Sequence, residues 1–194
     1  MEPSTSAPLR VCGLVGSLRK GSLNRGLMAA AQEIAPEVGM QVTVFDRLRE
    51  IPPYDADVDA AGDPEPVTAL KAAIREADAL LIATPEYNYS VPGFLKNAID
   101  WASRPPPSSP LRGKPAAIMG ASGGMSGTTR AQYHLRQMFV FTQTHALLQP
   151  EVLIPSAAAR FDAELRLTDE STRDLIHKQL TALAAWTRKL SATG

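Results

Sequence analysis

Residues 83–101 read ATPEYNYSVPGFLKNAIDW, and they join the end of an apolar strand to an amphipathic helix through a rigid polar loop. Two prolines restrict the backbone, and short polar side chains can fix backbone donors against a flat ring. In an open α/β sheet, ligands bind at the carboxyl ends of the strands, where such a loop lies. This stretch therefore indicates a binding platform within an α/β fold.

The same strand-to-helix pattern recurs along the chain. Apolar runs typical of buried strands lie at residues 9–15, 42–45, 79–84, 116–121 and 151–154. Segments of helical period follow them, at residues 27–38, 67–77, 94–102, 131–142 and 176–190. Parallel strands need crossover connections, and helices supply them on both faces of a sheet. The sequence thus predicts a doubly wound α/β fold with a five-stranded parallel sheet.

Composition limits the class of protein. The formal net charge is zero and aromatic residues make up 6% of the chain, so neither nucleic acid nor an anionic membrane is an expected partner. The single cysteine, Cys12, excludes an internal disulfide and a thiolate metal site, and we interpret it as a buried structural thiol. The three histidines lack the spacing of metal ligands, so no metal is proposed. A small molecule is the expected ligand.

The ends and irregular segments give no sign of a second domain. Residues 1–8 are polar and proline-rich, without the features of a signal peptide, and no apolar run approaches bilayer length. We expect a disordered leader at 1–8, one domain over 9–194 and, by default, a cytoplasmic location. Residues 49–66 and 104–115 separate strand–helix units that need one another for burial, so they are interpreted as surface loops.

The loop after the first strand has the form of an anion cradle. Residues 16–25 read GSLRKGSLNR, and a helix is predicted to begin near Asn24 with Ser22 or Asn24 as its cap. Glycines allow close backbone approach, and the helix N-terminus adds free amides and a positive dipole. The spacing matches neither a dinucleotide motif nor a P-loop, which favours a terminal monophosphate. An ordinary polar loop before a capped helix is the alternative.

A glycine-rich segment follows the fourth strand. Residues 120–129 read GASGGMSGTT, and their backbone can pass close to a ligand. Taken alone, a flexible connection would explain this composition equally well. The loops after strands one, three and four would, however, gather at one edge of a doubly wound sheet. Their convergence favours a ligand site.

These three loops give the chain a resemblance to the NAD(P)H-dependent FMN reductases of flavodoxin-like fold, which include bacterial quinone and chromate reductases. The matching motifs occur in the family's order: GSxRxxSxN at 16–24, PEYNxSxPGxLKNAIDW at 85–101 and GGxxGxxRAQxxLR at 123–136. The resemblance spans most of the fold, although the leader and the C-terminal segment match only in general character. It implies a flavodoxin-like sheet with strand order 2-1-3-4-5.

The resemblance also implies which residues bind FMN. The phosphate would be held by Ser17, Arg19, Ser22 and Asn24, the isoalloxazine ring lined by Pro85, Glu86, Tyr87 and Asn88, and its pyrimidine side met by Ser122, Gly123 and Gly124. Backbone N–H groups near the ring can stabilise charge on reduced flavin, so no catalytic side chain is expected. Glu86 could act as a general acid. We favour the alternative, that Glu86 is a loop residue that contributes through its backbone.

The implied activity is a ping-pong oxidoreduction, in which a hydride passes from NAD(P)H to FMN and the electrons pass on to a quinone or similar acceptor, such as free flavin, an azo compound or chromate. A flavodoxin-like electron carrier is the competing hypothesis. Flavodoxins are strongly acidic, whereas this chain is neutral, with Arg19, Lys20 and Arg25 around its first loop. A flavin-binding protein without catalytic activity is a third hypothesis.

Three other features lead to further predictions. Apolar helix surfaces at residues 94–101 and 130–141 favour a homodimer or homotetramer, as the family forms. The Asp-rich residues 54–59 lack the glycine and distal glutamate of a calcium loop, so a solvated loop is favoured, with Tyr54 near flavin or substrate by resemblance. Arg130 and Arg136 suit either a nicotinamide phosphate or a charged helix face, and both are left outside the site.

Overall fold

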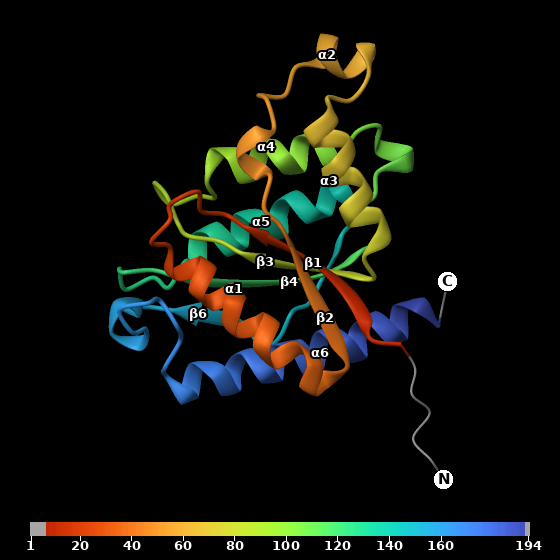
Figure 1. The fold of residues 1–194 in the computed structure, drawn as a ribbon. Coiled ribbons are helices and arrows are strands. Elements are labelled where there is room, and N and C mark those ends of the chain that lie inside the picture. Colours follow the sequence, from red (N-terminus) through yellow and green to blue (C-terminus); the bar gives the residue numbers. More distant parts are fainter. Residues whose placement is uncertain (1–6, 193–194) are drawn as a thin grey trace.

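A parallel β-sheet runs through the centre of the computed structural model, which describes residues 7–192 (Figure 1). Its strands are β1 (Leu9–Val15), β2 (Met40–Phe45), β3 (Ala79–Ala83), β4 (Pro115–Ala121), β5 (His145–Ala146) and β6 (Val152–Ile154). They follow the order β2-β1-β3-β4-β5, with β6 also paired to β4. The predicted strand order and fold class are confirmed. Most of the expected leader at 1–8 lies outside the described residues.

The edge of the sheet beyond β4 is built from two short strands where the sequence predicts one. β5 pairs with the beginning of β4, and β6 pairs with its end, so both occupy the same edge position. Pro150 lies between them and has no N–H to donate to a neighbouring strand. β6 begins within one residue of its predicted position, whereas two-residue β5 is too short to give a periodic signal.

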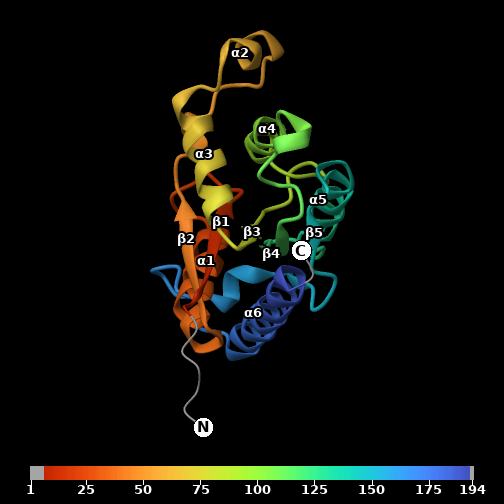
Figure 2. The same cartoon turned by 90° about the vertical axis from the view of Figure 1, so that its right-hand side faces the viewer.

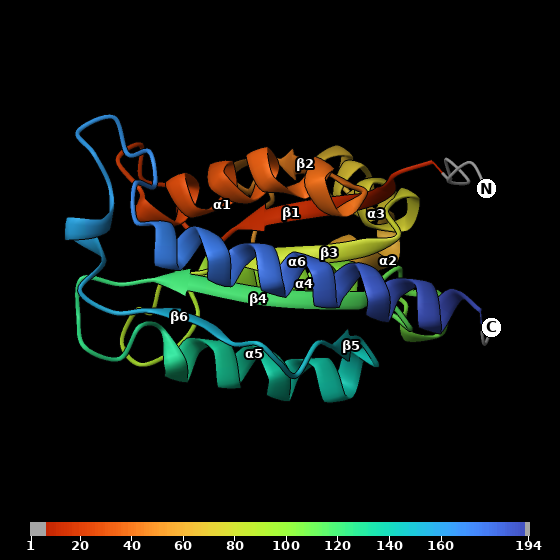
Figure 3. The ribbon, with the colours of Figure 1, turned by 90° about the horizontal axis from the view of Figure 1, so that it is seen from below.

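Helices cover both faces of the sheet, as Figures 1 and 3 show. The α-helices are α1 (Leu23–Ile34), α2 (Ala56–Ala61), α3 (Glu65–Glu76), α4 (Gly93–Ala102), α5 (Thr129–Thr142) and α6 (Glu170–Ser191), and the 3₁₀ turns are η1 (Ala35–Val38), η2 (Leu48–Glu50), η3 (Pro106–Ser108) and η4 (Ala157–Arg160). Helices α1 and α6 enclose one apolar core, and α3, α4 and α5 enclose the other. Successive strand residues alternate between the two cores: Leu81 faces the first, and Leu80 and Ile82 face the second.

The N-terminal part of the chain follows the sequence prediction closely, apart from one helix. Ser22 caps α1, as expected, and Cys12 is buried within β1. Burial raises the pKa of the Cys12 thiol to about 12, although the nearby charge of Lys114 opposes the shift. The thiol is therefore structural, as predicted. The stretch at 49–66, interpreted as a loop, contains η2 and α2, and α2 projects from the sheet without a buried residue (Figure 2).

Candidate functional site

The loops after β1, β3 and β4 lie together at the carboxyl edge of the sheet. The backbone N–H of Gly16 donates to the carbonyl of Ala83, 2.7 Å away, which joins the end of β1 to the end of β3. The Asn24 side chain donates to the Ala121 carbonyl and accepts from its N–H, both at 2.9 Å. The strand order thus brings together the three loops whose convergence the sequence predicts.

The first loop offers a row of backbone donors. The N–H groups of residues 17–21 donate to no acceptor within residues 7–192. Ser17 is buried, Arg19 is exposed, and the Ser22 hydroxyl accepts from the Arg25 N–H that follows it in α1. Free N–H groups beside a capped helix N-terminus are the arrangement that binds phosphate in many proteins. The loop therefore fits a monophosphate group.

Asn24 has a structural role that the sequence motif does not reveal. Its side chain is 3% exposed, and it uses its oxygen and one amide hydrogen on the backbone of Ala121. This pair of hydrogen bonds ties the first turn of α1 to the end of β4. The FMN contacts expected of Ser17, Arg19, Ser22 and Asn24 stay predictions.

The loop after β3 is rigid because it contains a tight turn. Tyr87 and Ser90 exchange two backbone hydrogen bonds of 2.9 Å, and the two residues between them both adopt left-handed conformations, with φ of 49° at Asn88 and 64° at Tyr89. Such angles are typical of a type I′ turn, and they are unusual for tyrosine. The N–H groups of Glu86 and Asn88 donate to no acceptor in the part of the chain that the structure describes. This loop thus holds free donors beside the predicted ring position.

The Glu86 carboxylate anchors this loop to the beginning of α5. One oxygen accepts from the backbone N–H groups of Arg130, at 2.9 Å, and Ala131, at 3.4 Å. The other accepts from the Arg130 guanidinium at 2.8 Å and the Ser126 hydroxyl at 3.2 Å. Burial alone would raise the pKa of Glu86, but these hydrogen bonds outweigh it and lower the pKa below its usual value. An acid held ionised is a poor proton donor, so the geometry argues against a general acid.

The loop after β4 is better ordered than its composition suggests. Ser122 donates its N–H to Ile154 and accepts from the N–H of Ala157, and its hydroxyl accepts from Gly124. The N–H of Gly123 has no acceptor among residues 7–192, and a Cβ built on Gly123 would meet nothing within 4 Å. A ligand can therefore approach this backbone directly.

An open cavity of about 600 Å³ lies between the loops after β3 and β4. Its lining includes both predicted and unpredicted residues: Glu86, Asn88, Tyr89, Ser122, Gly124, Ser126 and Arg130. The predicted residues Pro85, Tyr87 and Gly123 adjoin this lining in the chain, whereas the predicted phosphate residues are not part of it. The Arg130 guanidinium carbon lies 4.0 Å from the centroid of the Tyr89 ring. Arg130, which our sequence prediction left outside the site, therefore belongs to the cavity wall.

Three further residues, all outside the cavity lining, make structural contacts. Arg136 donates to the Leu147 carbonyl at 2.8 Å and so holds the segment between β5 and β6. Tyr54 packs edge-on against Trp101, with ring centroids 4.9 Å apart. His134 Nδ1 lies 2.9 Å from the Ser90 hydroxyl oxygen, which adds a second contact between α5 and the loop after β3.

Comparison with known proteins agrees with this geometry. Residues 9–159 match the sequence model of a family described as NADPH-dependent FMN reductase. An NAD(P)H-dependent FMN reductase of Pseudomonas aeruginosa is 54% identical over 185 residues, which cover 95% of this chain and 98% of that protein. A quinone reductase of Escherichia coli K12 is 44% identical over 187 residues, covering 95% and 98%. The structure of the flavoenzyme NAD(P)H:(acceptor) oxidoreductase FerB of Paracoccus denitrificans matches with a TM-score of 0.85 and 38% identity, covering 93% and 98%.

Proposed function

Because the chain belongs to the NADPH-dependent FMN reductase family, it is a flavin-dependent oxidoreductase, and we propose that it binds FMN where the loops after β1, β3 and β4 meet. The observation that carries this assignment is the set of free backbone donors in all three loops, at residues 17–21, Glu86, Asn88 and Gly123. Such donors suit an anionic phosphate and a ring that gains negative charge on reduction. The residues expected to contact FMN remain those of the sequence motifs.

We propose a quinone as the acceptor, with free flavin, azo compounds and chromate as competing substrates. Bound FMN would supply the chemistry, accepting a hydride from NAD(P)H and yielding the electron pair, with protons from solvent, to form the hydroquinone. The protein's residues bind and orient the reactants. Exposed rings of Tyr87 and Tyr89 beside the open cavity give a flat acceptor or a nicotinamide surface to stack on. One open face used by both substrates in turn is consistent with ping-pong kinetics.

The proposal is tested with purified protein. We expect a visible spectrum of bound FMN, bleaching of that spectrum on anaerobic addition of NADH or NADPH, and recovery of the spectrum when a benzoquinone is added. Parallel lines in double-reciprocal plots would support the ping-pong order. Bound FMN without NAD(P)H oxidation would instead favour the electron carrier or the non-catalytic flavin-binding protein.

We further propose that copies of the chain associate as a homodimer or homotetramer. Large apolar side chains on α5 stand exposed, including Tyr133, Val140 and Phe141, with Leu148 beyond its C-terminal end. Exposed apolar surface of this kind marks protein contacts. Sedimentation of the holoprotein at micromolar concentration tests this, and a monomer there would contradict it.

Location and domain organisation are also proposals. No helix among residues 7–192 is long and apolar enough to cross a membrane. We propose a cytoplasmic location and a single FMN-binding domain over residues 9–194, on the composition and segment pattern of the sequence. Fractionation of cells and limited proteolysis of the holoprotein test the two statements separately.

A further inference from the structure

A short hairpin between β6 and α6 lies across α1. We refer to residues 161–167 as the α1 clamp. Its ends, Phe161 and Leu167, form an antiparallel bridge, and both side chains are buried in the core that α1 and α6 enclose. The clamp therefore connects the last helix of the fold to the helix that follows the proposed phosphate loop.

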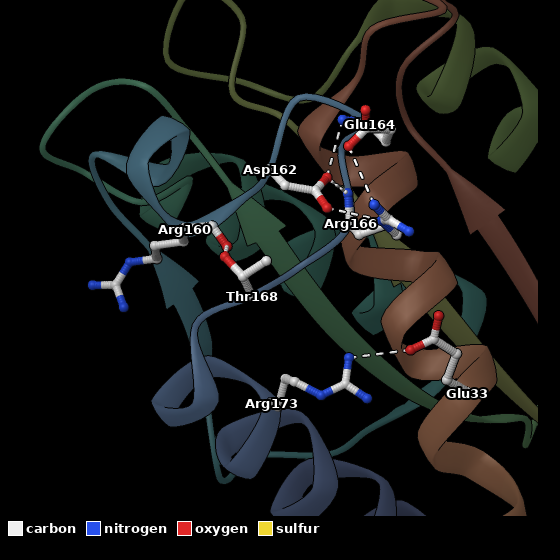
Figure 4. Close-up of polar contacts among 7 residues, drawn as sticks. All are labelled: Glu33, Arg160, Asp162, Glu164, Arg166, Thr168 and Arg173. Carbon is white, nitrogen blue, oxygen red and sulfur yellow. Dashed lines mark hydrogen bonds and ion pairs between the residues drawn. The ribbon is translucent and has the colours of Figure 1, made fainter.

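Asp162 holds the clamp in shape (Figure 4). One carboxylate oxygen accepts from the backbone N–H groups of Glu164 at 3.0 Å and Arg166 at 2.8 Å, and the other accepts from the Arg166 side chain at 2.8 Å. Leu165, at the tip, adopts a left-handed conformation with φ of 64°. These contacts fix where the Leu165 carbonyl points.

That carbonyl is directed at Gly26 of α1. A Cβ at Gly26 would lie 2.3 Å from the Leu165 oxygen and 2.9 Å from the ring of Phe161, so no other residue fits without displacement. Glycine destabilises a helix interior relative to alanine. The close packing of the clamp on α1 thus occurs at a position where the helix itself would be more stable with a side chain.

Gly26 lies between two other contacts that hold α1. Asn24, in the first turn, is bonded to Ala121 of β4, and Glu33, in the last turn, pairs with Arg173 of α6 at 3.1 Å (Figure 4). The clamp contact is next to the first turn of α1, which continues directly from the phosphate loop and its free donors at residues 17–21. A small tilt of this turn would lengthen several phosphate hydrogen bonds together, because their strength depends steeply on distance and angle.

We propose that the α1 clamp, seated on Gly26, positions the first turn of α1 for the phosphate of FMN. Gly26 and Asp162 are then positioning residues that act without touching the cofactor. The inference rests on the proposed FMN site. It assigns a binding role to a segment outside all three sequence motifs.

The test compares FMN with riboflavin, which has the same ring and lacks the phosphate. Dissociation constants are measured on the flavin-free protein by quenching of flavin fluorescence. For Gly26→Ala we expect the FMN constant to rise about tenfold, the effect of losing one hydrogen bond to a charged group. The riboflavin constant should stay unchanged. Equal weakening of both flavins, or unchanged FMN affinity, would overturn the proposal.

A second pair of variants keeps the test decisive if Gly26→Ala does not fold. Asp162→Ala removes the bonds that shape the clamp, whereas Glu164→Ala removes only an exposed contact with Arg166. Asp162→Ala should reduce the preference for FMN over riboflavin, and Glu164→Ala should retain it. The same preference in both variants would refute the clamp. A wild-type protein without that preference would instead contradict the proposed phosphate site itself.

Discussion

Two connections start at the carboxyl edge of the sheet, one after β2 and one after β6, and they differ in whether they pack on the core. The segment after β2 carries residues 55–63, here termed the arm, which project from the body with α2 at the tip (Figure 2). The segment after β6 carries the α1 clamp, which folds back on α1 (Figure 3). Both contain charged residues in ion pairs or caps, so charge does not separate them. Phe161 and Leu167 of the clamp are buried, whereas Val58 of the arm is 41% exposed.

The arm is nevertheless firmly attached at its base. The Pro52 carbonyl accepts from the side chains of Asn97 at 2.8 Å and Trp101 at 2.9 Å, and Lys71 pairs with Asp63 at the other end. The difference shows that hydrogen bonds fix where a connection begins, while buried apolar side chains decide whether it packs on the core. Matched pairs of variants in the arm and the clamp test whether burial makes this difference.

Phe161→Ala should have the largest effect. Removing a buried ring that packs on α1 leaves a cavity, and we expect the free energy of unfolding to fall by about 3 kcal/mol. Val58→Ala in the arm is the matched change and should stay within about 0.5 kcal/mol of wild type. Urea unfolding measures both. Similar losses from the two variants would show that the arm is packed as tightly as the clamp.

Glu86→Gln extends the comparison to carboxylates. The Glu86 side chain is 7% exposed and holds the loop after β3 to α5, so we expect the free energy of unfolding to fall by about 1 to 2 kcal/mol at neutral pH. Glu65, at the base of the arm, pairs with Arg47 in the open, so Glu65→Gln should cause no resolvable loss. Thermal and urea unfolding of both variants provide the comparison.

The Glu86 effect should depend on pH in a defined direction. The pKa of Glu86 in the folded protein lies below its ordinary value of 4.5, so its stabilisation is fully present above that pH. It is lost as the pH falls through the lowered pKa. The difference in unfolding free energy between wild type and Glu86→Gln should therefore shrink in acid. A difference that grows as the pH falls would contradict this assignment.

Removing the helix caps at the two connections should have the smallest effects on stability. Asp169 caps α6, and Asp55 caps α2, each accepting a backbone N–H at 2.8 Å. Because α6 packs in the core and α2 buries nothing, Asp169→Ala should lower the melting temperature and Asp55→Ala should not. Hydrogen bonds from Ser171 and Thr172 hold the pKa of Asp169 well below its usual range, so this effect should also fade as the pH falls below 3.8.

The regular part of the fold could be predicted because its signals are local. Strands β3 and β4 are continuous apolar runs, β1 is apolar apart from Arg10, and Ser22 is a favourable cap directly before a helical period. β5 and the α1 clamp carry no such period. The clamp depends on a contact between Gly26 and Leu165, residues far apart in the chain, which no local pattern encodes.

The candidate site could be located from the sequence, but its internal contacts could not. Three motifs at the ends of neighbouring strands predict where a ligand binds, since strand order alone brings them together. The anchoring of Glu86 to α5, the position of Arg130 over Tyr89 and the bond from Asn24 to Ala121 require knowing which helix begins beside which loop. Such information is in the packing of elements, and residue types do not reveal it.

The bond between Asn24 and Ala121 makes one side chain a spacer between two parts of the proposed site. It ties the loop that would receive the phosphate to the strand end that would receive the pyrimidine. The protein thereby sets the length of the chain that must connect ring and phosphate. A flavin with the same ring and a shorter or longer linker would reach only one end of the site. The site would therefore select its cofactor by the length of this linker as well as by the charge of the phosphate.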